Sequence, residues 1–283
     1  MAIRTDLALE QTQMIGVCDG VTSENINFGR IEIDRVSVKN NAAAEKLGKP
    51  IGDYVTISFD KFLPEDTSGD LHAAIKTELL SMLPKKHDNL VLVAGLGNRQ
   101  ITPDALGPKT AAKVFVTRHI KGTLANEIGL RGIMPVAAVS PGVLGDTGIE
   151  ASELILAAVE KLHPDAVIVI DALAARDISR LGSTVQITNA GINPGAGVGN
   201  CRPEISENTL GVPTVALGVP TVVDVSTFVE NYDGKEYTET LGKSMMVTPR
   251  DIDEMIVNAS QVLSHAINVA LQPNIESEVL ISL

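Results

Sequence analysis

Short apolar runs, each followed by small or polar residues, recur along the chain and predict buried strands. The clearest runs cover residues 90–94, 133–139, 166–170 and 214–219. Such runs, rich in β-branched residues and too short for ordinary helices, are typical of strands covered on both faces of a parallel sheet. Because strand, loop and helix alternate, we expect right-handed crossovers. The expected fold class is α/β, a mostly parallel sheet flanked by helices.

The expected helices follow from apolar residues spaced three or four positions apart. This spacing predicts helices at 71–83, 109–121 and 149–162, and a last helix with a continuous apolar stripe over 252–270. Pro108 cannot lie deep inside the second of these, so that helix either kinks there or begins at about residue 107.

The N-terminal part has a weaker pattern and predicts a small antiparallel addition. Residues 1–29 show little periodicity and are expected to be partly irregular. The apolar positions of residues 30–38 change phase midway, which a bulge near Asp34 would correct, and 54–59 is a second strand of this part. The polar segment Phe228–Lys243 predicts a surface loop. With no internal repeat or low-complexity tract, we expect residues 1–283 to form a single α/β domain.

Composition and charge narrow the class of protein. The chain has 44% hydrophobic residues and no Trp, with many Gly and aliphatic residues, which suits an α/β core. A formal net charge of −12 argues against a nucleic-acid partner, which would need a basic surface. Cys18 and Cys201 form no disulfide framework, so a reducing compartment is expected. Neither a signal peptide nor a membrane-spanning apolar run is present, which predicts a soluble, cytoplasmic protein with no membrane partner.

Two aspartates follow buried strands. A tight turn at Gly95–Asn98 and a helix-start pair, Thr102 and Pro103, deliver Asp104 beyond the carboxyl end of a strand. Asp171 directly follows another strand. Ligands bind at this edge of open α/β sheets, and two carboxylates held close share a proton. One could then deprotonate water while the other protonates a leaving group, although an aspartate at a helix start is often only a cap.

Other signals are weaker. The Gly95–Asn98 turn begins like a dinucleotide fingerprint but lacks its third glycine and the later acidic residue. None of the five histidines has metal-ligand spacing, so no metal or cofactor is expected. Ser140 is a turn residue rather than a nucleophile elbow. Arg176 could bind a substrate carbonyl or clamp Asp171, and a structural salt bridge is equally open.

Collinear motifs along nearly the whole chain resemble those of the germination protease, or spore protease, family. The motifs are RTDLALE (Arg4–Glu10), LGN-x3-TPDALGPK (Leu96–Lys109), SPGVLGDTGIEAS (Ser140–Ser152), IDALAAR (Ile170–Arg176), GINPGAGVGN-x-R-x-EIS (Gly191–Ser206), LGVPTVVD (Leu217–Asp224) and MVTP (Met246–Pro249).

The resemblance implies an endopeptidase that degrades small acid-soluble spore proteins during germination. Its catalytic pair falls on Asp104 and Asp171, with the assignment of acid and base left open, and Gly97, Asn98 and Arg176 are expected to bind substrate. It further implies a zymogen of the spore core that assembles as a homotetramer.

Two alternatives remain. The family is similar in structure to hydrogenase maturation endopeptidases, whose metal-linked site adds a histidine to an acidic pair; here no histidine lies between Asp171 and His265. The second alternative is a catalytically silent relative that only binds spore proteins. The segment between Asp224 and Met246 is also shorter than the resemblance leads us to expect.

The N-terminal motif resembles a substrate. Thr5–Glu10 matches the acidic–apolar–Ala–x–Glu pattern that this family cuts in spore proteins, which implies self-processing at the Asp6–Leu7 bond. Residues 1–6 would then be a short propeptide. A frayed terminus, or an edge strand that merely resembles a substrate, is the alternative.

Overall fold

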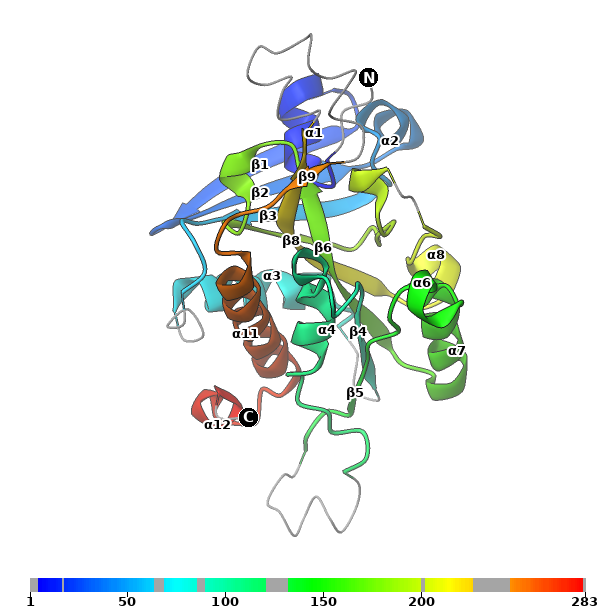
Figure 1. The fold of residues 1–283 in the computed structure, drawn as a ribbon. Coiled ribbons are helices and arrows are strands. Elements are labelled where there is room, and N and C mark those ends of the chain that lie inside the picture. Colours follow the sequence, from blue (N-terminus) through cyan, green and yellow to red (C-terminus); the bar gives the residue numbers. More distant parts are fainter. Residues whose placement is uncertain are drawn as a thin grey trace.

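The computed structural model describes residues 5–16, 18–63, 69–85, 90–120, 132–199, 202–225 and 245–281. The surface loop predicted at Phe228–Lys243 lies outside these residues. The described part contains a nine-stranded sheet (Figure 1) with the order β1-β2-β3-β7-β8-β6-β4-β5, and β9 pairs with β8. The strands are β1 Val21–Phe28, β2 Ile31–Val38, β3 Gly52–Ser58, β4 Val91–Gly95, β5 Val136–Val139, β6 Ala166–Ala175, β7 Thr184–Thr188, β8 Thr214–Asp224 and β9 Met246–Val247.

The sheet combines a parallel core with an antiparallel part. Strands β5, β4, β6 and β8 pair in parallel, whereas the pairings from β8 through β7, β3 and β2 to β1 are antiparallel. The predicted α/β class, with a parallel core and an antiparallel N-terminal part, is confirmed. The antiparallel part is larger than the expected hairpin, because β1 and β7 extend it. Within residues 1–29, which were predicted to be partly irregular, helix α1 (Ala8–Ile15) and β1 are regular, and the described residues before and between them lie outside helix and strand.

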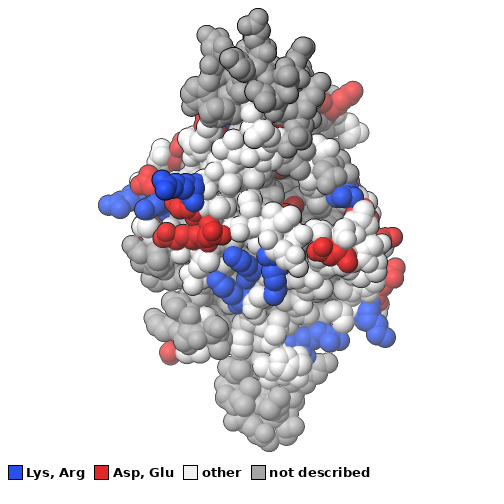
Figure 2. All heavy atoms as spheres, in the orientation of Figure 1, with Lys and Arg blue, Asp and Glu red and all other residues white. Residues whose placement is uncertain are grey.

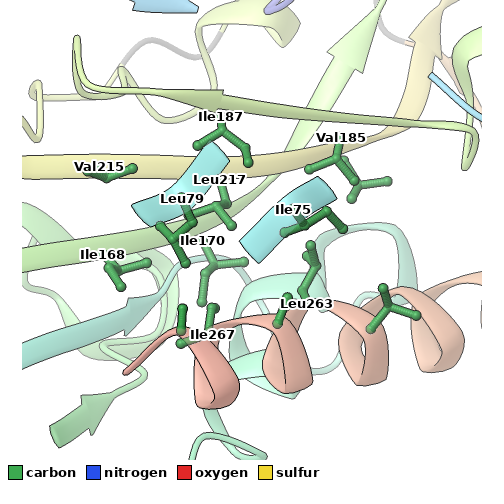
Figure 3. Close-up of a cluster of buried hydrophobic side chains, with 14 of the residues drawn as sticks. Ile75, Leu79, Ile168, Ile170, Val185, Ile187, Val215, Leu217, Leu263 and Ile267 are labelled. Carbon is green, nitrogen blue, oxygen red and sulfur yellow. The ribbon is translucent and has the colours of Figure 1, made fainter. Parts of the chain in front are cut away.

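Helices cover both faces of the sheet, as expected (Figure 1). On one face, α3 and α11 pack against β6, β7 and β8 through side chains such as Ile75, Leu79, Leu263 and Ile267 (Figure 3). On the other face, α7 and α8 cover β4, β6 and β8. The helices after α1 are α2 Asn41–Leu47, α3 Asp70–Met82, α4 Leu106–Ala111, α6 Leu144–Thr147, α7 Ala151–Leu162, α8 Glu207–Leu210, α11 Ile252–Leu271 and α12 Ser277–Ile281.

The bulge expected near Asp34 is absent from β2, which pairs with β1 and β3 without a register shift. Instead, β2 buries opposite faces at its two ends. Ile31 and Ile33 pack into the main core, whereas Val36 and Val38 pack with residues of α1 and α2. The change in phase of the apolar positions therefore reflects a change of the elements that β2 packs against, and not an inserted residue.

Two further boundaries differ from the sequence prediction. The helix expected at 109–121 begins at Leu106 but ends at Ala111, and the Asn268 side chain of α11 then holds the departing backbone by bonding to Lys113 O and Phe115 N. Strand β8 continues past Pro220 because a register shift against β6 falls at that point. A bulge of this kind accommodates a residue that cannot donate a ladder hydrogen bond.

The described residues include no helix that is long and apolar enough to cross a membrane. On the face drawn in Figure 2, the acidic and basic side chains of described residues alternate in small groups. The described residues on that face form no continuous basic tract of the kind that binds a nucleic-acid backbone.

Two histidines are buried against each other between α3 and α11. The rings of His72 and His265 lie 4.6 Å apart between centroids, and His265 Nε2 lies 3.1 Å from Ser277 Oγ of α12. His72 Nε2 and His265 Nδ1 are buried without a hydrogen-bond partner. Burial, together with His265 and Lys76, lowers the pKa of His72 to about 4.

This histidine pair should make the fold sensitive to mild acid. An unfolded histidine has a pKa of about 6.5, so below that value the unfolded chain takes up a proton that folded His72 resists until about pH 4. The free energy of unfolding should therefore fall by up to about 2 kcal/mol between pH 7.5 and pH 5 from this group. Urea unfolding at the two pH values measures it. His72→Leu should remove most of this decrease, and His119→Gln, at an exposed histidine, should not. Equal decreases in the wild type and His72→Leu would contradict it.

Candidate active site

Asp104 and Asp171 line one cavity of about 730 Å³ at the carboxyl ends of β4, β6 and β8. Of the other residues predicted for the site, Gly97, Asn98 and Asp6 also line it. Arg176 does not line it, and its role in substrate binding stays a prediction. The structure therefore brings together side chains that are far apart in the sequence, at the sheet edge where the sequence placed them.

Asp104 is held by close backbone packing of the segment that precedes it. It ends a 3-10 turn at Thr102–Asp104, directly before α4. A Cβ at Gly95 would collide with the backbone of Gly107, so β4 and α4 meet in backbone contact. Gly97 has a φ of +107°, and a Cβ there would collide with the backbone of Asp104. The Asn98 N–H donates to Asp104 Oδ2 at 2.7 Å.

Asp171 lies within β6, not at its end as the sequence suggested. The strand continues to Ala175 because β8 pairs with it along that length. On the other side, however, the pairing with β4 stops at Gly95 opposite Ile170. Asp171 is therefore the first residue of β6 beyond the end of β4, and its carboxyl lines the cavity left there. It is buried, and the Ala172 N–H donates to its Oδ1 at 2.9 Å.

The two carboxyl groups differ in their affinity for a proton. Burial raises the pKa of Asp171 well above its ordinary range, and the charges of Asp104 and Asp6 raise it further. Burial also raises the pKa of Asp104, but the Asn98 N–H partly offsets this. Asp171 is therefore the member of the pair that holds a proton more strongly.

The N-terminal segment is docked beside this cavity. From Thr5 onward it is not a frayed terminus: Leu7 is fully buried in an apolar cluster with Leu173, Ala175 and Val223. Self-processing at the Asp6–Leu7 bond stays a prediction.

Glu10, in α1, links the N-terminal segment to the two residues that follow β6. Its carboxylate accepts hydrogen bonds from the Arg176 and Asp177 N–H groups at 2.8 and 2.9 Å, and from the Thr5 hydroxyl. Arg180 Nε lies 3.9 Å from Glu10 Oε1. Arg176 thus contributes its backbone to holding the N-terminal segment.

Sequence reasoning missed an ion pair at the cavity wall. Arg202 and Glu150 both line the cavity, and Arg202 NH1 lies 3.3 Å from Glu150 Oε1. Each lies in a segment that carried the family resemblance, which is the signal that could have identified them.

Comparison with known proteins identifies the family. The profile of the family described as "Germination protease" matches residues 3–237. This chain belongs to the germination protease family. The germination protease of Clostridium tetani is 41% identical over 98% of each chain. That of a Clostridium perfringens strain is 38% identical over 98% of this chain and 97% of its own, and that of Oceanobacillus iheyensis is 35% identical over 97% and 95%.

A solved structure was also found in the comparison. It is a NiFe hydrogenase maturation protease from Thermococcus kodakarensis, 14% identical, with a TM-score of 0.38, covering 67% of this chain and 98% of its own.

The metal-linked alternative needs a ligand cluster. Among the residues that the structure describes, no three His, Cys, Asp or Glu side chains come together as a metal site. Asp104 and Asp171 thus have no histidine beside them in that part of the chain, and the arrangement there is of carboxyl groups, backbone N–H groups and one wall ion pair.

Proposed function

We propose that this protein is an endopeptidase that degrades small acid-soluble spore proteins during germination, using Asp104 and Asp171. One observation carries the proposal: the two carboxyl groups line a single cavity and interact electrostatically, and each lies in a motif that resembles the family's. The cavity is open to solvent and large enough for several residues of an extended peptide.

The difference in proton affinity suggests how the work is divided. Asp104, whose carboxylate accepts the Asn98 N–H, removes a proton from the attacking water. Asp171, which holds its proton more strongly, donates that proton to the leaving amine as the peptide bond breaks. The proton that Asp104 gained then replaces the one that Asp171 lost, so the pair returns to its starting state. Gly97 and Asn98 would contact the substrate beside Asp104, and Arg176 stays a proposed substrate contact.

Incubation of the purified protein with a small acid-soluble spore protein tests the proposal. Discrete fragments are expected, with cleavage after an acidic residue. A spore protein that binds but stays intact would overturn the protease proposal in favour of the silent, binding relative. From the family we also propose that the protein acts in the spore core and forms a homotetramer, which sedimentation equilibrium would test.

Proteolysis should survive removal of divalent metals, because both proposed catalytic groups act on protons alone. The cleavage rate after treatment with EDTA, followed by desalting, should equal that of the untreated enzyme within about twofold. Loss of activity on chelation that a single added divalent metal restores would overturn this expectation. It would favour the metal-linked, hydrogenase-maturation type of peptidase.

A further inference from the structure

The carboxyl group of Asp6 occupies a cradle of main-chain donors beside the catalytic cavity. The Ala174 N–H donates to Asp6 Oδ2 at 2.8 Å, and the Gly197 N–H also bonds to this carboxyl group. The Asp6 N–H in turn donates to Ala174 O at 2.9 Å. Asp6 is therefore bound to β6 both through its backbone and through its side chain.

Two further side chains hold the backbone of the same segment. Lys49 Nζ donates to Asp6 O at 2.8 Å and to Thr5 O at 3.2 Å. Gln186 Nε2 donates to Asp6 O at 3.1 Å, while Gln186 Oε1 accepts the Ala8 N–H at 2.8 Å. These contacts bind peptide groups, so they would fit any extended chain, whereas the Ala174 and Gly197 donors are specific for the side-chain carboxylate.

Opposing effects act on the charge of Asp6 in the cradle. The attraction between Asp6 and Lys49 opposes the effect of burial on both pKa values: burial raises that of Asp6 and lowers that of Lys49. The space is also shaped for a carboxyl group, because a Cβ at Gly197 would collide with the Asp6 carboxylate. A glycine is thus needed here for the carboxyl group to bind.

Asp6 also separates two hollows. With Leu173 it lines both the large cavity that holds Asp104 and Asp171 and a second cavity of about 100 Å³ that Lys49 and Gln186 line. Because Asp6 lines both cavities, removal of its side chain would open the cradle to the catalytic cavity. Any peptide that enters there meets the donors that Asp6 now occupies.

Cleavage after an acidic residue is what the family resemblance implies. We propose that the subsite for this acidic side chain lies next to the catalytic pair and is formed by Lys49, Gln186, Ala174 and Gly197. In the intact chain Asp6 fills this subsite and competes with substrate. An asparagine or glutamine in the same place would lose the attraction of Lys49 and would present an amide group to two N–H donors. Sites built from such donors discriminate strongly against ligands that cannot accept both bonds. The inference rests on the proposed protease function for its biological meaning.

Peptide binding tests the subsite independently of catalysis. The probe is a labelled peptide of residues 1–13 of this chain, with Asp6 or with Asp6→Asn. A third version carries Asp6→Asn together with Gln13→Glu, which restores the net charge. The receptor is the full chain with Asp104→Asn to prevent cutting and Asp6→Ala to remove the chain's own carboxyl group from the cradle. Both Asn peptides should bind at least about tenfold more weakly than the Asp peptide. Equal dissociation constants for the three peptides would overturn the proposal.

Variants of the receptor test which residues cause the preference for the Asp peptide over the Asn peptide. Gly197→Ala should bring the Asp/Asn affinity ratio close to one. Gly145→Ala, in the wall of the same cavity but where a Cβ meets no atom within 4 Å, should preserve the ratio. Lys49→Met should lower the ratio, and Lys46→Met, at an exposed lysine of α2, should not. If folded Gly197→Ala and Lys49→Met chains keep the same Asp/Asn affinity ratio as the unchanged receptor, the proposal is also overturned.

A parallel cleavage assay separates this inference from the proposed function. With Asp104 intact, the Asp peptide should show at least about a tenfold higher kcat/KM than the Asn peptides. Asp6→Ala in the enzyme should lower KM for the Asp peptide with little change in kcat, because a competing group is removed. Equal cleavage of Asp and Asn peptides contradicts the subsite alone. Absence of any cleavage, of peptides or of spore protein, contradicts the protease function, and the binding ratio then still decides the subsite.

Discussion

Asp104→Asn and Asp171→Asn are each expected to abolish proteolysis while the fold remains intact. Each variant removes one member of an acid–base pair, which should lower kcat by at least ~10²-fold. The asparagine of the second variant would be neutral in a buried place where burial raises the pKa of the native Asp171. An acid whose folded pKa lies above its unfolded value destabilises the fold as pH rises past the unfolded value, so Asp171→Asn should melt no lower than the wild type at pH 7. Cleavage of a spore protein and thermal melting, measured together, check both parts.

The matched control is Asp146→Asn, at an exposed aspartate of α6 near the same cavity, which should keep normal activity. Because the pair acts as a unit, the double variant should be about as inactive as either single one. Near-normal cleavage by a folded Asp104→Asn or Asp171→Asn chain would remove that residue from the mechanism.

The sequence predicted the core of the fold because its strands are defined locally. The apolar runs that became β4, β6 and β8 need no knowledge of their neighbours to be recognised. The ends of these elements depend on contacts with other parts of the chain. Strand β6 continues to Ala175 because β8 pairs with it, and after α4 the backbone is hydrogen-bonded by the Asn268 side chain. Likewise, the change of phase in β2 shows only that the buried face changes, not whether a bulge or a new partner causes it.

The same distinction applies to the site. Asp104 and Asp171 could be placed in one crevice because each follows a buried apolar run in the sequence, and the ends of parallel strands share an edge. The cradle around Asp6 could not be predicted from the sequence, because it joins the N-terminal segment to β6 and to Gly197, which lie far along the chain. Lys49 and Gln186 lie in no motif, and only their contacts with Asp6 O reveal them.

Self-processing at the Asp6–Leu7 bond is the second result with a large expected effect. After incubation at mildly acidic pH, intact-mass measurement should show a new N-terminus at Leu7, with the loss of residues 1–6. Burial raises the pKa of Asp6, so mild acid neutralises this carboxyl group at a higher pH than an exposed aspartate. A neutral Asp6 is attracted less strongly by Lys49, and the segment can then leave the cradle in extended form.

The structure also predicts what limits this reaction. Lys49 and Gln186 hold the carbonyl of the bond to be cut, and Leu7 is buried, so the segment must be released before it is cleaved. Asp104→Asn should prevent the change at any pH, because it removes the base that activates water. An unchanged mass in an enzyme that degrades spore protein would show that this family member needs no such activation. Processing that persists in Asp104→Asn would show that another protease, or another group of this chain, makes the cut.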